Sequence, residues 1–155
     1  VPISPLYMMF SKACVANPTS FSFAEVYLAL QQGVVDAQEN PLPTIKAKKF
    51  YEVQKFINLT GHITDSLLTI IGGPLYNKLS DTDRAIFIEE LQASAVKVSQ
   101  DIVDAENSLA EWFEGQGVTV NRVDITPFRE ATMKLHNGPD ATWSQEVYDR
   151  LQAIK

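Results

Sequence analysis

The stretch Gly33-Val34-Val35-Asp36-Ala37-Gln38-Glu39-Asn40-Pro41 lies between two predicted helices. Gly33 is typical of a helix end and Pro41 of a helix start, so the residues between them are predicted to form a short strand. Alternation along that strand would place Asp36, Gln38 and Asn40 on one face. Ligands of open α/β sheets bind beside the carboxyl ends of strands. We therefore expect Asn40 to lie where a small polar ligand binds, although a merely solvated strand end has the same pattern.

Hydrophobic periodicity and turn residues predict the elements on either side of this stretch. Helices or helical turns are predicted over residues 5–15, 23–32, 41–49, 50–54, 74–79, 80–114, 127–135 and 142 or 144 to 154. Strands are predicted over 56–60, 67–71 and 118–123, the second of them fully buried. Ser22 and Glu25, three residues apart, predict a capping box for the second helix. Mixed short strands and helices indicate an α/β fold.

The predicted helix over 80–114 is the longest element. Its apolar residues recur at alternating spacings of three and four: Ile88, Leu91, Ala95, Val98, Ile102, Ala105, Leu109 and Trp112. At 1.5 Å per residue the helix would be about 50 Å long, more than one small domain measures. Such a seam could be half of a coiled coil that dimerises, or it could belong to a helix that spans two lobes.

Several segments recur in fixed order around the central stretch. They are Ala16-Asn17-Pro18-Thr19, Phe23-Ala24-Glu25-Val26-Tyr27-Leu28-Ala29-Leu30-Gln31, Gln38-Glu39-Asn40-Pro41, Lys49-Phe50-Tyr51-Glu52-Val53-Gln54-Lys55 and Leu59-Thr60-Gly61-His62. This series resembles the C-terminal half of a TRAP-transporter solute-binding protein of the DctP type, a class of periplasmic receptors for organic acids. The resemblance covers essentially the whole chain and is densest from Val1 to His62.

The resemblance implies the C-terminal half of a two-lobed periplasmic binding protein (type II-like) with one long lobe-spanning helix. Residues 1–65 and 106–155 would form most of lobe II. Residues 66–105 would cross into lobe I as a strand and the first part of the long helix. The family's N-terminal half is missing from this chain. Val1-Pro2-Ile3-Ser4-Pro5 fits this expectation, because it reads as the end of a strand and shows no signal peptide.

The resemblance also assigns ligand contacts. Asn40 would contact the ligand's carboxylate or a nearby polar group, since an amide donates hydrogen bonds without a charge of its own. Phe23, which the residues alone would place in the core, would pack against the ligand and exclude water. Gln38 and Glu39 would support Asn40. The expected partners are an organic acid (dicarboxylate, keto acid or sugar acid), which the sequence does not specify further, and the TRAP membrane permease subunits.

The sequence departs from the family pattern in a few places. The family's arginine, which pairs with the ligand carboxylate through two hydrogen bonds, would immediately precede Val1 and is absent here. We therefore expect this chain alone to bind ligand weakly or not at all. Ser20 replaces a usual proline, Phe21 a usual methionine and Ala37 a frequent glycine. These changes look neutral, although Ser20 and Phe21 lie near enough to Phe23 to alter the pocket's shape.

Composition and motifs limit the other function classes. A net charge of −6 and a pI of about 4.8 argue against nucleic acid as a partner. Cys14 is the only cysteine, and we expect it to be buried. No motif for a nucleophile, phosphate loop, cofactor or metal is present. His62 and His136 are expected to be hydrogen-bonded histidines of loops or strand ends. An enzyme would need an acid–base pair around Asp36 or Glu39, so we expect a periplasmic receptor without catalytic activity.

Overall fold

The computed structural model describes residues 4–136, 138 and 141–154. Its α-helices are α1 (Pro5–Ala13), α2 (Val26–Gln31), α3 (Leu42–Ala47), α4 (Gly73–Tyr76), α5 (Asp81–Gly115), α6 (Thr126–Met133) and α7 (Gln145–Gln152). Two short 3₁₀ helices, η1 (Phe23–Glu25) and η2 (Phe50–Glu52), and two strands, β1 (Phe56–Asn58) and β2 (Thr119–Asn121), complete the order. Most of the strand end expected at Val1–Pro5 falls outside the described residues, and Pro5 begins α1.

The hydrophobic core lies where the C-terminal end of α5 meets α3, η2 and the small sheet. β1 and β2 pair in parallel, with Ile57 opposite Val120. Phe50 and Phe113 are 1% and 0% exposed and are the largest fully buried side chains of the described residues. Around them pack the remaining buried residues of the core: Leu30, Ile45, Ile57, Leu109 and Val118. The core therefore joins α2, α3 and the last two turns of α5 into one body.

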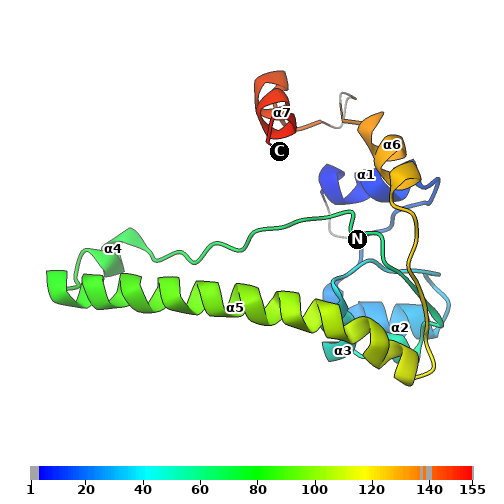
Figure 1. The fold of residues 1–155 in the computed structure, drawn as a ribbon, viewed down its shortest axis with the longest axis horizontal. Coiled ribbons are helices and arrows are strands. Elements are labelled where there is room, and N and C mark those ends of the chain that lie inside the picture. Colours follow the sequence, from blue (N-terminus) through cyan, green and yellow to red (C-terminus); the bar gives the residue numbers. More distant parts are fainter. Residues whose placement is uncertain (1–3, 137, 139–140, 155) are drawn as a thin grey trace.

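A second layer of the body is formed by α1 and α6, which lie against one another (Figure 1). The ring of Phe10 stacks on that of Phe128 with centroids 5.9 Å apart. α1 ends at Ala13, because Val15 adopts a left-handed backbone with φ of 59°. Cys14 is consequently exposed at the end of the helix, and the expectation of a buried cysteine is wrong.

Ser144 caps α7, its hydroxyl accepting a hydrogen bond from the Val147 amide at 3.3 Å. His136 packs edge-on against Trp143 and Tyr148, with ring centroids 5.8 Å and 5.7 Å apart. The Nδ1 atom of His136 is buried without a hydrogen-bond partner. The hydrogen bond expected for this histidine is therefore missing at Nδ1, and aromatic contacts hold it instead.

A long arm, made of residues 63–105, projects from the body (Figure 1). Residues 63–72 lead from the body to α4 without helix or paired strand, α4 turns the chain at the tip, and α5 returns over 35 residues. The single helix expected over 80–114 is confirmed. Ser80 caps it as expected, because its hydroxyl accepts a hydrogen bond from the Asp83 amide at 3.1 Å. Every helix in the described part of the chain is too short or too polar to span a bilayer.

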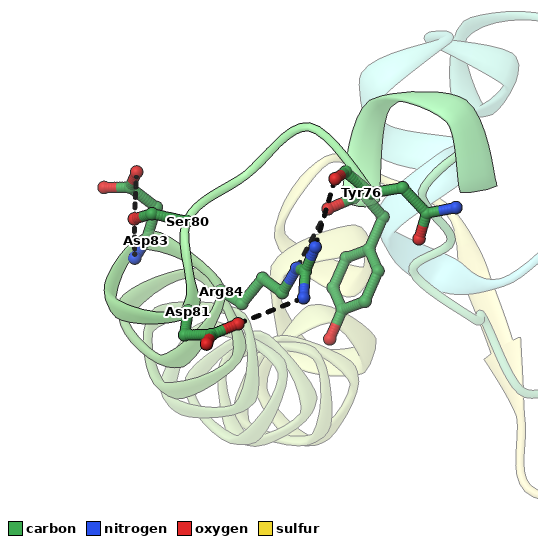
Figure 2. A network of polar contacts seen from close by, with 6 residues as sticks. Tyr76, Ser80, Asp81, Asp83 and Arg84 are labelled. Carbon is green, nitrogen blue, oxygen red and sulfur yellow. Dashed lines mark hydrogen bonds and ion pairs between the residues drawn. The ribbon is translucent and has the colours of Figure 1, made fainter.

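Polar contacts close the tip of the arm (Figure 2). The Arg84 guanidinium donates to the carbonyl oxygens of Tyr76 and Asn77, each at 3.1 Å, and to Asp81 at 3.2 Å. It also lies over the Tyr76 ring, 5.1 Å from the centroid. Carbonyls at a helix end need donors from outside the helix, and Arg84 supplies them. One side chain of α5 thereby holds α4 in place.

Two predicted strands are wrong. Residues 34–40 form a bend and an extended loop, and residues 67–71 are extended but pair with no strand in the described part of the chain. Leu67, Leu68 and Ile70 are 92%, 83% and 88% exposed, although their apolar pattern is that of a buried strand. A strand requires a neighbour to accept and donate its backbone hydrogen bonds, and none of the described residues provides one for either segment.

The helix predicted over 23–32 is shorter in the structure, and its first residues form a 3₁₀ turn. η1 precedes α2, and the Ser22 side chain makes no cap hydrogen bond. The Glu25 amide bonds instead to the Ser22 carbonyl oxygen at 2.9 Å. The predicted capping box is therefore wrong, since a backbone turn opens this segment. The predicted helix end at Gly33 is confirmed: Gly33 has φ of +68°, a left-handed conformation that glycine adopts without strain.

Candidate functional site

The Gln38-Glu39-Asn40 loop connects α2 to α3. After α2, the amide of Val34 bonds back to the Ala29 carbonyl oxygen at 2.8 Å, which turns the chain away from the helix. Pro41 then precedes the first residue of α3. All three loop side chains are partly buried. Because no strand forms here, Asp36 is not aligned with Gln38 and Asn40 on a strand face, and it is exposed.

Asn40 and Gln38 contact each other. The Asn40 Nδ2 atom donates a hydrogen bond to Gln38 Oε1 at 2.6 Å. This bond occupies one of the two amide hydrogens of Asn40, and an amide offers a further N–H and a carbonyl oxygen. Asn40 is not among the residues of the hydrophobic core. Gln38 thus orients the Asn40 amide in the structure, while the supporting role of Gln38 in a ligand site and the ligand contact of Asn40 both stay predictions.

Glu39 points to a different partner, His62. The Glu39 Oε2 atom lies 3.8 Å from His62 Nε2, and these side chains are 21% and 16% exposed. The other ring nitrogen, Nδ1, is hydrogen-bonded to Thr60 Oγ1 at 2.6 Å, which confirms the expected hydrogen-bonded histidine. Gly61, with φ of +52°, makes the bend that brings Thr60 and His62 together. Glu39 therefore supports the loop through this pair, and its expected support of Asn40 stays a prediction.

Burial controls the protonation of this pair. Burial raises the pKa of Glu39 above its ordinary value of 4.5 and lowers the pKa of His62 below its ordinary value of 6.5. Burial disfavours both charged forms, and at 3.8 Å the Glu39–His62 contact is too long to offset it as a hydrogen bond would. The Phe10 ring stacks on the His62 imidazole with centroids 3.6 Å apart. At neutral pH His62 is consequently an uncharged imidazole between α1 and the loop.

Phe23 lies on η1 and is 47% exposed. Its edge-to-face contact with Phe50 has a centroid distance of 6.2 Å and an interplanar angle of 87°. The Lys48 ammonium lies 5.2 Å from the centre of its ring. The ring thus rests on the core while half of it faces outward, and its contacts are separate from those of the Gln38–Asn40 loop. Phe23 as a ligand contact also stays a prediction.

Sequence reasoning missed the partners of Glu39. The signal was present in Leu59-Thr60-Gly61-His62, since a glycine between two polar residues indicates a bend that turns both to one side. Phe10 carried no comparable signal. A hollow of about 380 Å³ lies elsewhere, between α1 and α6, and is lined by Met9, Lys12, Ala13, Ala131, Lys134, Leu135 and Gly138. It includes no residue of the predicted site.

The chemistry of this region is that of binding. The loop offers an amide held by a second amide and a partly buried carboxylate beside a neutral imidazole, and a half-exposed aromatic ring lies on η1. Among the described residues, no group of three or more histidine, cysteine or acidic side chains is placed to hold a metal ion. Oriented neutral donors and a ring are what recognition of a polar, partly apolar small molecule requires.

Residues 1–140 match the family model described as bacterial extracellular solute-binding protein, family 7 (DctP). The chain belongs to this family. It is 41% identical over 154 residues to the sialic acid-binding periplasmic protein SiaP of Vibrio cholerae, an alignment that covers 99% of this chain and 48% of that protein. It is 31% identical over 117 residues to the 2,3-diketo-L-gulonate-binding periplasmic protein YiaO of Escherichia coli, covering 76% of this chain and 36% of that protein.

Solved structures of TRAP periplasmic solute-binding proteins share the fold. One from a Polaromonas species, bound to D-erythronate, superposes with a TM-score of 0.89 at 32% identity and covers 100% of this chain and 52% of its own. One from Roseobacter denitrificans, bound to 3-deoxy-D-manno-oct-2-ulosonic acid, has a TM-score of 0.86 at 32% identity and coverages of 99% and 51%. The fold is therefore α/β and corresponds to about half of a two-lobed binding protein. The relatives are receptors for organic acids in transport, and the family is extracytoplasmic.

Proposed function

We propose that this chain is the ligand-capturing C-terminal half of an extracytoplasmic TRAP receptor, which binds a sugar acid and delivers it to a membrane permease. The observation that carries the proposal is the similarity along 99% of the chain to a protein named for sialic acid binding. The ligands named for the solved relatives, D-erythronate and 3-deoxy-D-manno-oct-2-ulosonic acid, are also sugar acids. The chain spans about half the length of these relatives, so the complete receptor includes more polypeptide than this chain.

In the proposed receptor, Asn40 donates a hydrogen bond to the acid, and Gln38 holds the Asn40 amide in the orientation that this bond requires. A neutral donor suits a carboxylate whose charge is balanced elsewhere, because it adds no unpaired charge to the closed site. Phe23 covers the apolar face of the sugar carbons with its outward half. Glu39 and His62 hold the loop against α1 without contacting the ligand.

We also propose which residues belong to each lobe of the receptor. Residues 1–65 and 106–155 form most of one lobe, and residues 66–105 cross into the other. The described arm supports this assignment, because residues 63–105 leave the body and return to it through α5 (Figure 1). Lobes joined by such crossings close on their ligand by a hinge motion. This chain alone offers one wall of the site and is expected to bind sugar acids weakly or not at all.

A chimeric receptor tests the proposal. In it, this chain replaces the matched part of the Vibrio cholerae protein, and calorimetry measures binding of sialic acid, 3-deoxy-D-manno-oct-2-ulosonic acid and D-erythronate. Asn40→Ala is expected to weaken binding by at least several-fold, because it removes the neutral donor. Asn107→Ala, on the exposed face of α5, is the matched control and should leave affinity unchanged. Equal affinities of the Asn40→Ala chimera and the unmodified chimera would remove Asn40 from the site.

A further inference from the structure

Residues 60–71 connect the body to the arm without backbone hydrogen bonds. None of the backbone hydrogen bonds among the described residues involves this segment, although β1 just before it is paired with β2. The chain crosses between body and arm a second time through α5, which Phe113 anchors in the core. Of the two crossings, α5 is therefore stiff along its length, whereas the position of residues 60–71 depends on side-chain contacts.

Two of these contacts come from one side of α1. The Tyr7 hydroxyl donates a hydrogen bond to Asp65 Oδ2 at 2.9 Å, and the Phe10 ring stacks on His62 with centroids 3.6 Å apart. Tyr7 and Phe10 are three residues apart, so they lie on the same side of the helix. Their partners are also three residues apart, in the segment that passes beside α1 before it runs out along the arm (Figure 1). α1 thus holds the segment at two points.

Asp65 accepts hydrogen bonds on both of its carboxylate oxygens. Oδ2 accepts from Tyr7, and Oδ1 accepts from the backbone amide of Ser66 at 2.8 Å. The carboxylate therefore ties a side chain of α1 to the backbone near the start of the arm. The hydrogen bond to Asp65 raises the pKa of Tyr7 above its ordinary value of 10.0, so the hydroxyl keeps its proton at neutral pH and remains a donor. A hydrogen bond to a charged acceptor is stronger than one between neutral groups.

The same segment reaches the candidate site. His62 lies between the Phe10 ring and Glu39, whose Oε2 atom is 3.8 Å from His62 Nε2. Glu39 directly precedes Asn40 in the loop. α1 is itself held in place, since Phe10 also packs against Phe128 of α6 with centroids 5.9 Å apart. One helix therefore holds both the start of the arm and, through His62, the loop that contains Asn40.

We propose that Tyr7 is a positioning residue: by holding Asp65 it fixes where the chain leaves the body, and so sets the position of the arm relative to the Asn40 loop. The whole chain, body and arm together, superposes on a relative solved with D-erythronate bound. The Tyr7–Asp65 hydrogen bond therefore accompanies the arrangement of a ligand-bound receptor, and it favours that arrangement. Its effect on ligand binding rests on the proposed function, whereas the holding of the segment does not.

The first experiment measures the mobility of the segment in this chain by ¹⁵N relaxation. Tyr7→Phe removes only the hydroxyl. The order parameters of the Asp65 and Ser66 amides are expected to fall from the value of an ordered backbone, about 0.85, to below about 0.6. Tyr27→Phe is the matched control, because the Tyr27 hydroxyl donates to Glu52 Oε2 at the same distance of 2.9 Å and both residues belong to the body. It should leave the order parameters of Asp65 and Ser66 unchanged.

The second experiment uses the chimeric receptor described above and measures dissociation of sialic acid, 3-deoxy-D-manno-oct-2-ulosonic acid and D-erythronate by stopped flow. Tyr7→Phe and Asp65→Ala are each expected to speed dissociation at least threefold. The double variant should dissociate no faster than Asp65→Ala alone, because both changes remove the same hydrogen bond. Tyr27→Phe should dissociate at the rate of the unmodified chimera. A loss of folded protein would lower the amplitude of the signal and leave the rate constant unchanged.

Unchanged order parameters at Asp65 and Ser66 in Tyr7→Phe would overturn the proposal. So would equal dissociation rates of the Tyr7→Phe and Tyr27→Phe chimeras, or a double variant in which the effects of Tyr7→Phe and Asp65→Ala add. A chimera that binds none of the three sugar acids would refute the proposed function, and the order parameters measured in this chain would then decide the inference about Tyr7.

Discussion

The two ends of α5 have opposite surroundings within one continuous helix. Phe113, near its C-terminal end, is 0% exposed in the core, whereas Phe87, near its N-terminal end, is 39% exposed on the arm. Both residues have the same side chain and the same helical backbone. What differs is whether this chain supplies the neighbours. The body is stabilised by its own residues, and the arm has the composition of an interior without the rest of that interior.

The largest effect on the free energy of unfolding is expected from Phe113→Ala, with Phe87→Ala at the other end of α5 as the comparison. Phe113→Ala is expected to lower the free energy of unfolding by about 3–5 kcal/mol, because it leaves a cavity among Phe50, Leu109 and their neighbours. Phe87→Ala should cost less than about 1 kcal/mol in this chain, since little is packed against it. Chemical denaturation followed by circular dichroism measures both. Similar losses of free energy of unfolding for the two variants would mean that residues of this chain pack against Phe87 as they do against Phe113.

Local signals in the sequence located most of the body and the whole of α5. Ser80 as a cap, the apolar seam and Gly33 as a helix stop act through nearest neighbours along the chain, so the sequence contains what is needed to recognise them. The strands predicted at 34–40 and 67–71 failed for a different reason. Strand formation depends on a partner that is distant in sequence or absent from this chain, and an apolar run does not say whether that partner is present.

In the candidate site, too, contacts between segments that are distant in sequence could not be predicted from local signals. The motif around Asn40 drew attention to this stretch but predicted a strand, whereas the structure shows a loop in which Asn40 Nδ2 donates to Gln38 Oε1. The pairing of Glu39 with His62 joins residues that lie on separate segments of the chain. The stacking of Phe10 on His62 brings in α1 as well. Such contacts follow from the fold as a whole, and spacing along the sequence does not reveal them.

The second prediction concerns His62, which links the loop to the body. Replacing it by glutamine removes the stack on Phe10 and disturbs the bond to Thr60, so His62→Gln should cost about 1–2 kcal/mol at pH 7.5. Its pKa is lowered in the folded protein, so its contribution is complete above about pH 6.5 and is lost as the pH falls. The unmodified chain should therefore lose stability between pH 7.5 and 5.5, and His62→Gln should lose less.

Glu39 provides a control of opposite sign. Because its pKa is raised by burial, the folded protein binds a proton at Glu39 more readily than the unfolded chain does, which favours folding as the pH falls. Glu39→Gln removes this gain and also the negative charge near the imidazole. The loss of stability as the pH falls from 7.5 to 4.5 should therefore be steeper in Glu39→Gln than in the unmodified chain. Identical slopes for all three proteins would contradict the pairing of these side chains.

A smaller effect is expected at the end of α2. Gly33 has φ of +68°, and a Cβ atom there would meet no other atom within 4 Å, so the cost of Gly33→Ala is conformational alone. That cost is about 1 kcal/mol, because L-residues with a Cβ atom disfavour the left-handed region. Gly115→Ala is the matched control: Gly115 ends α5 in a helical conformation with equal space, and the change should cause no loss. Thermal denaturation of the two variants compares them directly.

The smallest effect on global stability should come from Arg84, although this residue makes the most polar contacts at the tip of the arm (Figure 2). Arg84→Ala removes the donors that hold the end of α4, so amide exchange over residues 73–79 should accelerate. The free energy of unfolding should change by less than about 0.5 kcal/mol, because local opening of a segment outside the core is not part of the cooperative transition. Lys97→Ala, which breaks an exposed ion pair with Asp101 further along α5, is the control. It should leave amide exchange over residues 73–79 unchanged and should change the free energy of unfolding by less than about 0.5 kcal/mol.

If Arg84→Ala instead destabilised the whole chain by about 2 kcal/mol or more, the tip of the arm would belong to the same cooperative unit as Phe113. The two ends of α5 would then differ in the exposure of their side chains but not in their contribution to the stability of the body.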